Sequence, residues 1–170
     1  MNIESYIRDI PDFPKTGVIF KDITPLLNDA TARKEVINRF IQNLPDTKID
    51  KVVGIESRGF FFGILLAQEL GVGFVPVRKK GKLPFETLSA SYELEYGTDI
   101  LEIHTDAIQK GENILIHDDV LATGGTMKAV CELVEQLGGN IVQVNFLMEL
   151  EFLKGKEKIK DVNTHSILKY

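Results

Sequence analysis

Short apolar or alternating runs and longer amphipathic segments follow one another along most of the chain. The runs predict buried β-strands, at residues 51–57, 73–79, 113–119 and 141–150. The amphipathic segments repeat apolar side chains at helical spacing and predict helices, at residues 30–44, 59–71 and 125–137. Because strands and helices of these lengths alternate, the pattern predicts βαβ units. We therefore expect an α/β fold with a mostly parallel, twisted sheet flanked by helices.

Two segments break this alternation. Residues 1–28 carry several prolines and predict an irregular N-terminal arm, or hood, with one short strand. Residues 80–105 begin with glycine and proline and then alternate apolar with polar side chains on either side of Gly97. They predict a flexible loop followed by an antiparallel hairpin that projects from the parallel sheet. At 170 residues, the whole chain is expected to form a single domain.

Composition and charge narrow the class of protein. With 44% hydrophobic and 26% charged residues, the chain is typical of a globular protein. A formal net charge of −5 argues against nucleic acids and acidic membranes as partners. The single cysteine, Cys131, excludes an internal disulfide and is expected to be a small buried filler. Since the N-terminus lacks a signal-peptide core and no apolar run is long enough to span a membrane, we expect a soluble, cytoplasmic protein.

The most informative motif follows the apolar run that begins near residue 114. Asp118 and Asp119 end that run, and small residues at 122–126 precede the next helix. Small residues allow a turn whose backbone N–H groups converge at the positive end of the helix, which suits a phosphate monoester. The two carboxylates can accept hydrogen bonds from a ribose diol. An ordinary strand-to-helix turn with an acidic cap is the plainer interpretation.

Two further motifs follow neighbouring runs, and ligands of open α/β sheets bind beyond such strand ends. Residues 54–59 read GIESRG, and residues 78–82 read RKKGK. A basic run is often only a solvated surface. A local basic cluster of this kind can also hold a small anion. The glycines at 124–125 belong to neither a Walker loop nor a G-x-G-x-x-G motif, which disfavours nucleoside triphosphates and dinucleotides.

The motifs together resemble the type I phosphoribosyltransferases, and VLATGGT after paired acids resembles the adenine phosphoribosyltransferases among them. Further blocks are similar to that family in the same order, from about Pro11 to about Lys156: PDFPKTGVIFKDITPLL, GIESRGFFFG, GFVPVRKKGKLP and YELEYGTDILEIHTDAI. The resemblance implies transfer of a phosphoribosyl group from phosphoribosyl pyrophosphate (PRPP) to adenine, giving AMP and pyrophosphate. It also implies Mg²⁺ as cofactor and a homodimer.

The resemblance implies roles for single residues on the donor side. The ribose hydroxyls are expected at Asp118 and Asp119. The 5-phosphate is expected in the loop formed by Ala122, Thr123, Gly124, Gly125 and Thr126. Pyrophosphate is expected at Ser57, Arg58, Arg78, Lys79 and Lys82, with a cis peptide between Glu56 and Ser57. The metal is expected to be held through PRPP and pyrophosphate, with no direct protein ligand.

On the base side, the resemblance implies that Glu95 is catalytic, together with Arg58 at the leaving group. Adenine must attack through N9, and the Glu95 carboxyl would exchange a proton at N7 while the ribosyl centre passes through an oxocarbenium-like state. A solvent-facing position on an edge strand suits Glu95 equally well. Tyr96 is the expected lid, which would exclude water from the reactive donor.

Adenine recognition is expected from the N-terminal strand, at Ile19, Phe20 and Lys21. Lys21 stands where the family more often has arginine, so the planar fork of guanidinium donors is lost. His117 also departs from the family pattern, and it is either a satisfied strand-end histidine or a neighbour of the ribose site. The residues after Lys156 match least well, and no site is assigned to them.

Two other functions stay open at this point. A related purine transferase would act on xanthine, or on hypoxanthine and guanine, whose 6-oxo group needs a donor where adenine needs an acceptor. A regulator that binds PRPP without catalysis would typically carry an added DNA-binding module. The irregular residues before the first helix and the negative net charge argue against such a module.

Overall fold

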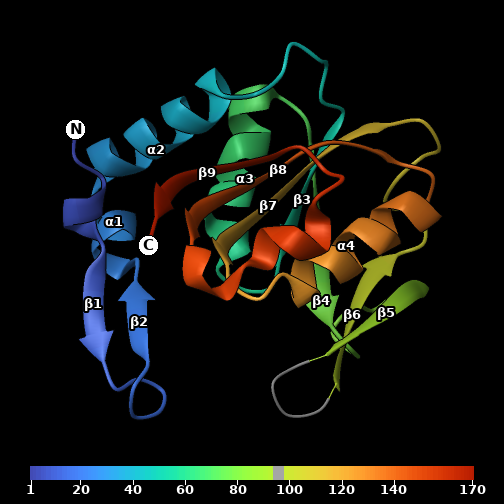
Figure 1. Ribbon diagram of the computed structural model, residues 1–170. Helices are drawn as coiled ribbons and strands as arrows, with labels where there is room; N and C mark the ends of the chain where they lie inside the picture. Colours follow the sequence, from blue (N-terminus) through green and yellow to red (C-terminus); the bar gives the residue numbers. More distant parts are fainter. Residues whose placement is uncertain (94–97) are drawn as a thin grey trace. The chain divides into compact units, whose positions relative to one another are not determined.

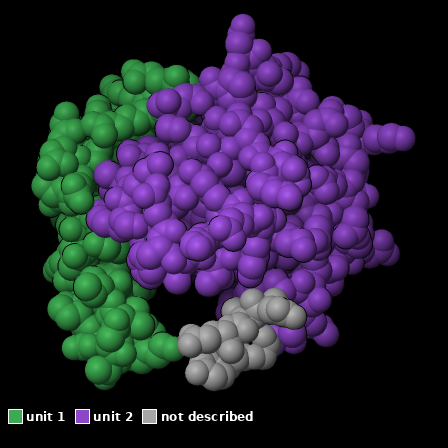
Figure 2. Space-filling view, viewed as in Figure 1, with its two compact units in different colours: residues 1–42 green, residues 43–170 purple. Residues whose placement is uncertain are grey.

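The computed structural model describes residues 1–93 and 98–170, apart from the side chain of Glu93. The chain divides into two compact units, residues 1–42 and residues 43–170 (Figure 2). Within the described residues, no helix has both the length and the apolar character that crossing a membrane requires.

The first unit contains a short antiparallel strand pair and two α-helices. Its elements are η1 (Glu4–Tyr6), β1 (Arg8–Pro11), β2 (Ile19–Asp22), α1 (Thr24–Asn28) and α2 (Ala30–Gln42). The prediction of one strand in the N-terminal arm is therefore wrong, because β1 pairs with β2 from Arg8↔Asp22 to Pro11↔Ile19. The sequence of β1 has charges and a proline in place of apolar alternation, so only its hydrogen bonds to β2 define it. The helix predicted at 30–44 is confirmed as α2.

The second unit is built on a seven-stranded sheet with the order β5-β6-β4-β3-β7-β8-β9 (Figure 1). The strands are β3 (Lys51–Ile55), β4 (Gly73–Lys79), β5 (Thr87–Glu93), β6 (Thr98–His104), β7 (Asn113–Leu121), β8 (Asn140–Glu149) and β9 (Thr164–Lys169). The pairs from β4 to β9 are parallel, whereas β6 runs antiparallel to β4 and β5. This confirms a mostly parallel sheet with an antiparallel hairpin, which extends from the end of β4.

Two α-helices connect the parallel strands on opposite faces of this sheet. Helix α3 (Gly59–Leu70) leads from β3 to β4, and α4 (Gly125–Gln136) leads from β7 to β8. These crossovers run in opposite directions along the strand order, so right-handed connections place them on opposite faces. The topological switch point thus falls between β3 and β7, where open α/β sheets bind ligands.

The sheet contains more strand residues on its carboxyl-terminal side than the sequence predicts. Strand β7 continues beyond Asp119 to Leu121, because parallel pairing with β8 extends to Leu121↔Glu149. After β8 the chain forms two short turns, η2 (Glu151–Leu153) and η3 (Gly155–Ile159). It then returns as β9, a strand that the apolar pattern does not predict, since its residues are only half-buried. The core between the sheet and α4 includes Ile116, Val130 and Phe146.

Candidate active site

The acid pair lies on β7 at the switch point. Pairing of β7 with β3 ends at Gly54↔His117, whereas pairing with β8 continues. Asp118 and Asp119 therefore lie in the part of β7 that pairs with β8 but no longer pairs with β3. Asp119 is 5% exposed, and its backbone N–H donates to Asp118 Oδ1 at 2.9 Å. The Asp118 carboxylate is thus held by the backbone N–H of its neighbour.

The first turn of α3 packs against this acid pair. A methyl group at position 59 would approach Asp118 Oδ1 to 2.7 Å and the Asp118 Cα to 3.2 Å, so glycine allows the helix to begin this close. Arg58, the residue before α3, places its Nε 2.7 Å from Asp119 Oδ2. The segment SRG, which follows β3, therefore contacts both acids of β7.

Burial shifts the titration of both acids. Burial and the neighbouring Asp119 carboxylate raise the pKa of Asp118 well above its usual range. Burial also raises the pKa of Asp119, although the Arg58 guanidinium opposes this change. Two adjacent carboxylates in a poorly solvated position favour ligands that donate hydrogen bonds or carry positive charge. A ribose diol has these donors.

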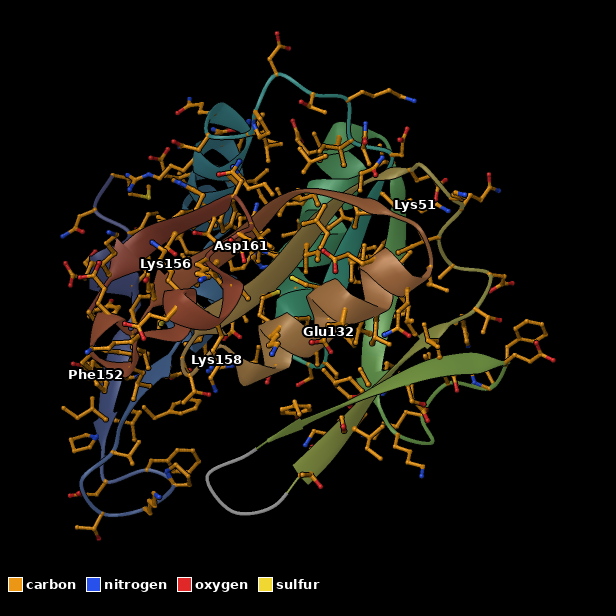
Figure 3. All side chains as sticks on the ribbon, turned by 45° about the vertical axis from the view of Figure 1, so that its right-hand side comes forward. Lys51, Glu132, Phe152, Lys156, Lys158 and Asp161 are labelled. Atoms are coloured by element: carbon orange, nitrogen blue, oxygen red, sulfur yellow. The ribbon has the colours of Figure 1, made fainter. Side chains whose placement is uncertain are left out.

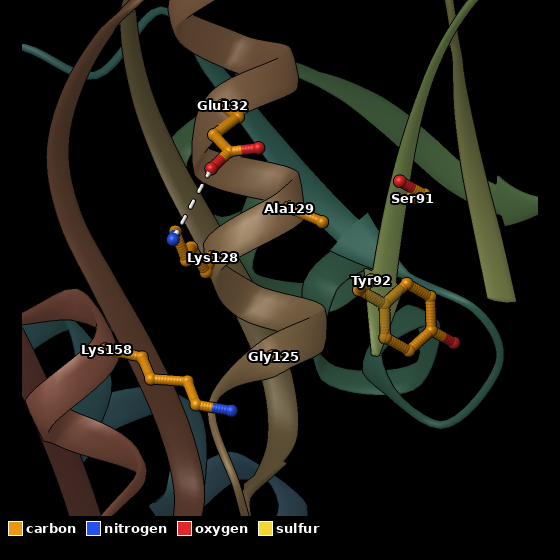
Figure 4. A pocket seen from close by; sticks show the side chains of 7 residues that line it. All are labelled: Ser91, Tyr92, Gly125, Lys128, Ala129, Glu132 and Lys158. Carbon is orange, nitrogen blue, oxygen red and sulfur yellow. Dashed lines mark ion pairs between the residues drawn. The ribbon is translucent and has the colours of Figure 1, made fainter. Parts of the chain in front are cut away.

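The small-residue loop leads from β7 into α4, as the sequence predicts. Gly124 precedes the helix with φ 78°, a left-handed conformation that favours glycine, and Thr123 is exposed. The first N–H groups of a helix have no partners within it, so this loop offers donors at the positive end of α4. A pocket of about 300 Å³ lies beside Gly125, between α4 and β5, and Lys158 extends toward Gly125 (Figure 4).

The basic run is organised by Glu56, for which the sequence pattern predicts no role. Lys82 Nζ donates to Glu56 Oε1 at 2.9 Å, and the Arg78 Nε lies 3.4 Å from Oε2. The backbone N–H of Lys79 donates to Glu56 Oε2 at 2.9 Å. Burial opposes ionisation of Glu56, but these hydrogen bonds outweigh it and lower the pKa of Glu56 to about 2. Glu56 therefore holds the basic run beside the segment that begins at Ser57.

Replacing Glu56 with glutamine removes its charge-assisted hydrogen bonds and is expected to lower the free energy of unfolding at pH 7. The loss is expected to be only roughly 1–2 kcal/mol, because water screens the half-exposed Lys82 partner. The folded pKa is depressed, so this stabilisation is present above the unfolded pKa and decreases as pH falls from about 4.5 toward 2. Urea unfolding at pH 7 and pH 3.5 should show that the free energy of unfolding falls less between these pH values in the variant than in the wild type. Equal losses would contradict the role of Glu56.

Lys79 contacts the hairpin. Its Nζ lies 3.1 Å from Asp99 Oδ2, and the Tyr92 hydroxyl donates to the same oxygen at 3.2 Å. The hydrogen bond with Asp99 raises the pKa of Lys79. Burial, followed by the Asp99 charge, raises the pKa of Tyr92, while a hydrogen bond with Thr126 opposes the rise. This chain of contacts connects β4, the hairpin and the start of α4.

The structure thus places most predicted donor-side residues at or after the carboxyl ends of the parallel strands β3, β4 and β7. The Glu56–Ser57 peptide is cis, as expected. His117 is fully buried, places Nδ1 2.7 Å from Asn145 Oδ1 and packs edge-on against Phe62. This fits a buried strand histidine held through Nδ1, and burial lowers its pKa to about 4. Cys131 is buried, which raises its pKa to about 12.

The residues predicted to recognise the base belong to the other compact unit. Ile19, Phe20 and Lys21 belong to β2 of the first unit, where Ile19 is 58% exposed and Lys21 Nζ lies 2.7 Å from Asp9 Oδ1. The ring of Phe20 meets that of Phe13 edge-on at 5.1 Å. Glu95 and Tyr96 lie outside the described residues, so their roles stay predictions.

Comparison with known proteins identifies the class. The sequence model of the phosphoribosyl transferase domain matches residues 26–167. The chain belongs to the phosphoribosyltransferase family.

Relatives over the full length define the branch of that family. A Flavobacterium johnsoniae protein named adenine phosphoribosyltransferase is 68% identical over 170 residues, which cover 100% of both chains. The crystal structure of adenine phosphoribosyltransferase from Thermoanaerobacter pseudethanolicus is similar with a TM-score of 0.96 and 54% identity, over 99% of this chain and 98% of that one. The Saccharomyces cerevisiae enzyme, complexed with adenine and an imino-altritol bisphosphate, has a TM-score of 0.93 and 46% identity, covering 96% and 95% of the two chains. The branch is that of the adenine phosphoribosyltransferases.

Proposed function

We propose that this chain transfers the 5-phosphoribosyl group of PRPP to adenine, forming AMP and releasing pyrophosphate, in purine salvage. The observation that carries the proposal is the meeting of the acid pair with the small-residue loop at the start of α4. Together they provide acceptors for a diol and donors for a phosphate monoester. The full-length identity of 68% to an adenine phosphoribosyltransferase supports adenine as the acceptor base.

On the donor side, Asp118 and Asp119 bind the ribose hydroxyls, and the N–H groups of 122–126 bind the 5-phosphate. Ser57, Arg58 and the basic run bind pyrophosphate. As the bond from C1 to the pyrophosphate oxygen breaks, the oxygen keeps the electron pair, and nearby cations stabilise the charge that develops. The ion pair of Arg58 with Asp119 supports this role, because it holds a guanidinium beside the ribose acids.

On the base side, N9 of adenine forms the new bond to C1, and the ring must lose one proton in balance. We assign the proton exchange at N7 to Glu95, exclusion of water to Tyr96, and recognition of the base to Ile19, Phe20 and Lys21. The Lys21 ammonium, which lies 2.7 Å from Asp9 Oδ1, supplies charge without the planar fork of an arginine.

Magnesium fits this donor set as an ion carried by the substrate. Mg²⁺ keeps several waters and commonly binds one or two carboxylates together with substrate phosphates. The described residues contain no group of three or more histidine, cysteine or acidic side chains that could hold a metal ion by itself. The ion would be held through PRPP and pyrophosphate, beside the acids that bind the ribose, and it would neutralise charge on the leaving pyrophosphate. We also propose a homodimer in the cytoplasm, which light scattering and fractionation would test.

Incubation with PRPP, Mg²⁺ and a single base is expected to give AMP from adenine and no nucleotide from hypoxanthine, guanine or xanthine. The reason is that a site arranged for the 6-amino group of adenine leaves a 6-oxo group without its donor. Chromatographic separation of the nucleotides measures the result. Omission of Mg²⁺ and an Arg58→Ala variant serve as controls, both with reduced turnover.

Other results would change the proposal in defined ways. A nucleotide from another base would contradict the assignment of adenine while keeping the donor site. Tight binding of PRPP without product from any base would favour a regulator instead of an enzyme.

A further inference from the structure

The loop at residues 122–126, the proposed 5-phosphate site, rests on a segment for which the sequence pattern predicts no role. Gly155 begins η3, and its backbone meets the backbone of the loop. A methyl group on Gly155 would collide with the carbonyl oxygen of Ala122 and come within 3.1 Å of Gly124 N. A methyl group on Gly124 would in turn collide with the carbonyl oxygen of Gly155. The two backbones therefore lie so close that neither position has space for a side chain.

The segment that carries Gly155 is fixed to the end of the sheet. Lys156, labelled in Figure 3, places its Nζ 2.8 Å from Glu149 Oε2, and the Glu149 side chain is only 6% exposed. Ser166 of β9 also donates to Glu149 Oε2, at 3.2 Å. Glu149 is the register partner of Leu121, the last residue of β7 before the loop. The ion pair thus anchors the segment beside the residue from which the loop departs.

Two further contacts complete this anchorage. Ile159, at the end of η3, is 4% exposed and belongs to the core beneath α4. The backbone N–H of Leu150 donates to the carbonyl oxygen of Leu121 at 2.9 Å. The segment is therefore held at both ends, and Gly155 lies between them, against the loop. A small displacement at Gly155 would be passed directly to the backbone of residues 122–124.

We propose that Gly155 is a positioning residue for the 5-phosphate, acting through the backbone of the loop. The identity of the ligand rests on the proposed function. A phosphate bound by several backbone N–H groups needs all of them to converge, and fixed geometry of this kind is lost with displacements of about 1 Å. The Ala122 carbonyl oxygen faces Gly155, which leaves the opposite side of the loop for the ligand. Lys156 and Glu149 support the arrangement by holding Gly155 in place.

The test compares three glycine-to-alanine variants. Gly155→Ala is expected to raise the Kd of ribose 5-phosphate and of AMP by about 10-fold or more, with the Kd of pyrophosphate unchanged. Gly139→Ala is the control for overpacking, since its methyl group would lie 3.0 Å from Ile114 and Val134 in the core at the other end of α4. It should lower Tm without changing any of the three affinities. The methyl group of Gly73→Ala would contact only Lys51, at 3.5 Å, and this variant should change neither Tm nor the affinities.

Calorimetric titration measures these affinities without turnover. Selective loss of ribose 5-phosphate binding in Gly155→Ala supports the proposal, and wild-type affinity in that variant overturns it. If Gly155→Ala does not fold, Lys156→Ala decides. Several-fold weaker binding of ribose 5-phosphate, restored in Lys156→Arg, supports the proposal, and unchanged binding overturns it. A wild-type protein that binds ribose 5-phosphate but forms no AMP would contradict the proposed function alone.

Discussion

Exchange of Asp118 for asparagine is expected to weaken PRPP binding by about 10- to 100-fold, because a charge-assisted hydrogen bond to a ribose hydroxyl becomes a neutral one. The same variant is expected to have a higher Tm than the wild type. The pKa of Asp118 is raised by burial and by Asp119, so the folded state loses stability as pH rises through that pKa. Asparagine carries no charge and avoids this loss. Titration with PRPP and Mg²⁺, together with thermal unfolding at pH 7.5, measures both effects.

The opposite signs of these two changes make the experiment decisive. A variant that was merely misfolded would lose PRPP affinity and Tm together. Asp161→Asn removes an exposed acid on the turn before β9 and is the matched control, with no expected change in PRPP affinity. Undiminished PRPP affinity in Asp118→Asn would contradict the ribose assignment.

Exchange of Glu95 for glutamine is expected to lower kcat by about 100-fold or more while the Kd of PRPP stays unchanged. The amide has nearly the shape of the carboxylate but cannot exchange the proton that adenine must lose. Single-turnover kinetics with saturating adenine and PRPP separates the chemical step from product release.

Glu93→Gln is the matched control, since it removes an acid two positions earlier in the same segment. Its kcat should equal that of the wild type. Unchanged kcat in Glu95→Gln would exclude Glu95 from catalysis. An equal fall in both variants would show that the negative charge of this sequence segment, and not the proton exchange, controls the rate.

Periodicity along the chain predicted the elements of the second unit well, because each one has to bury a face of its own. The runs at β3, β4, β7 and β8 are apolar for this reason, and the helices after β3 and β7 follow from their spacing. Strands β1 and β9 were missed, since their partners on other strands define them and their own patterns do not. The acids Asp118 and Asp119 could be found because they interrupt an apolar run.

The function of Glu56 could not be read from the sequence, for a geometric reason. Residues 56 and 78 are far apart in the chain and meet only because β3 and β4 pair in parallel with Ile55 opposite Val77. The same holds for Gly155, which reaches the loop only after the chain has passed through α4 and β8. Sequence patterns therefore show which residues carry chemistry, whereas the register of the sheet decides which residues position them.

The contact between Gly124 and Gly155 also limits how this chain can evolve. Every substitution at a glycine codon adds at least a methyl group, and either backbone would then have to move. A change at one position cannot be compensated at the other, because the partner is already the smallest residue. These two sites are therefore expected to stay fixed in descendants that keep the loop, even where the surrounding surface drifts. Deep mutational scanning would show them as paired positions without tolerated replacements.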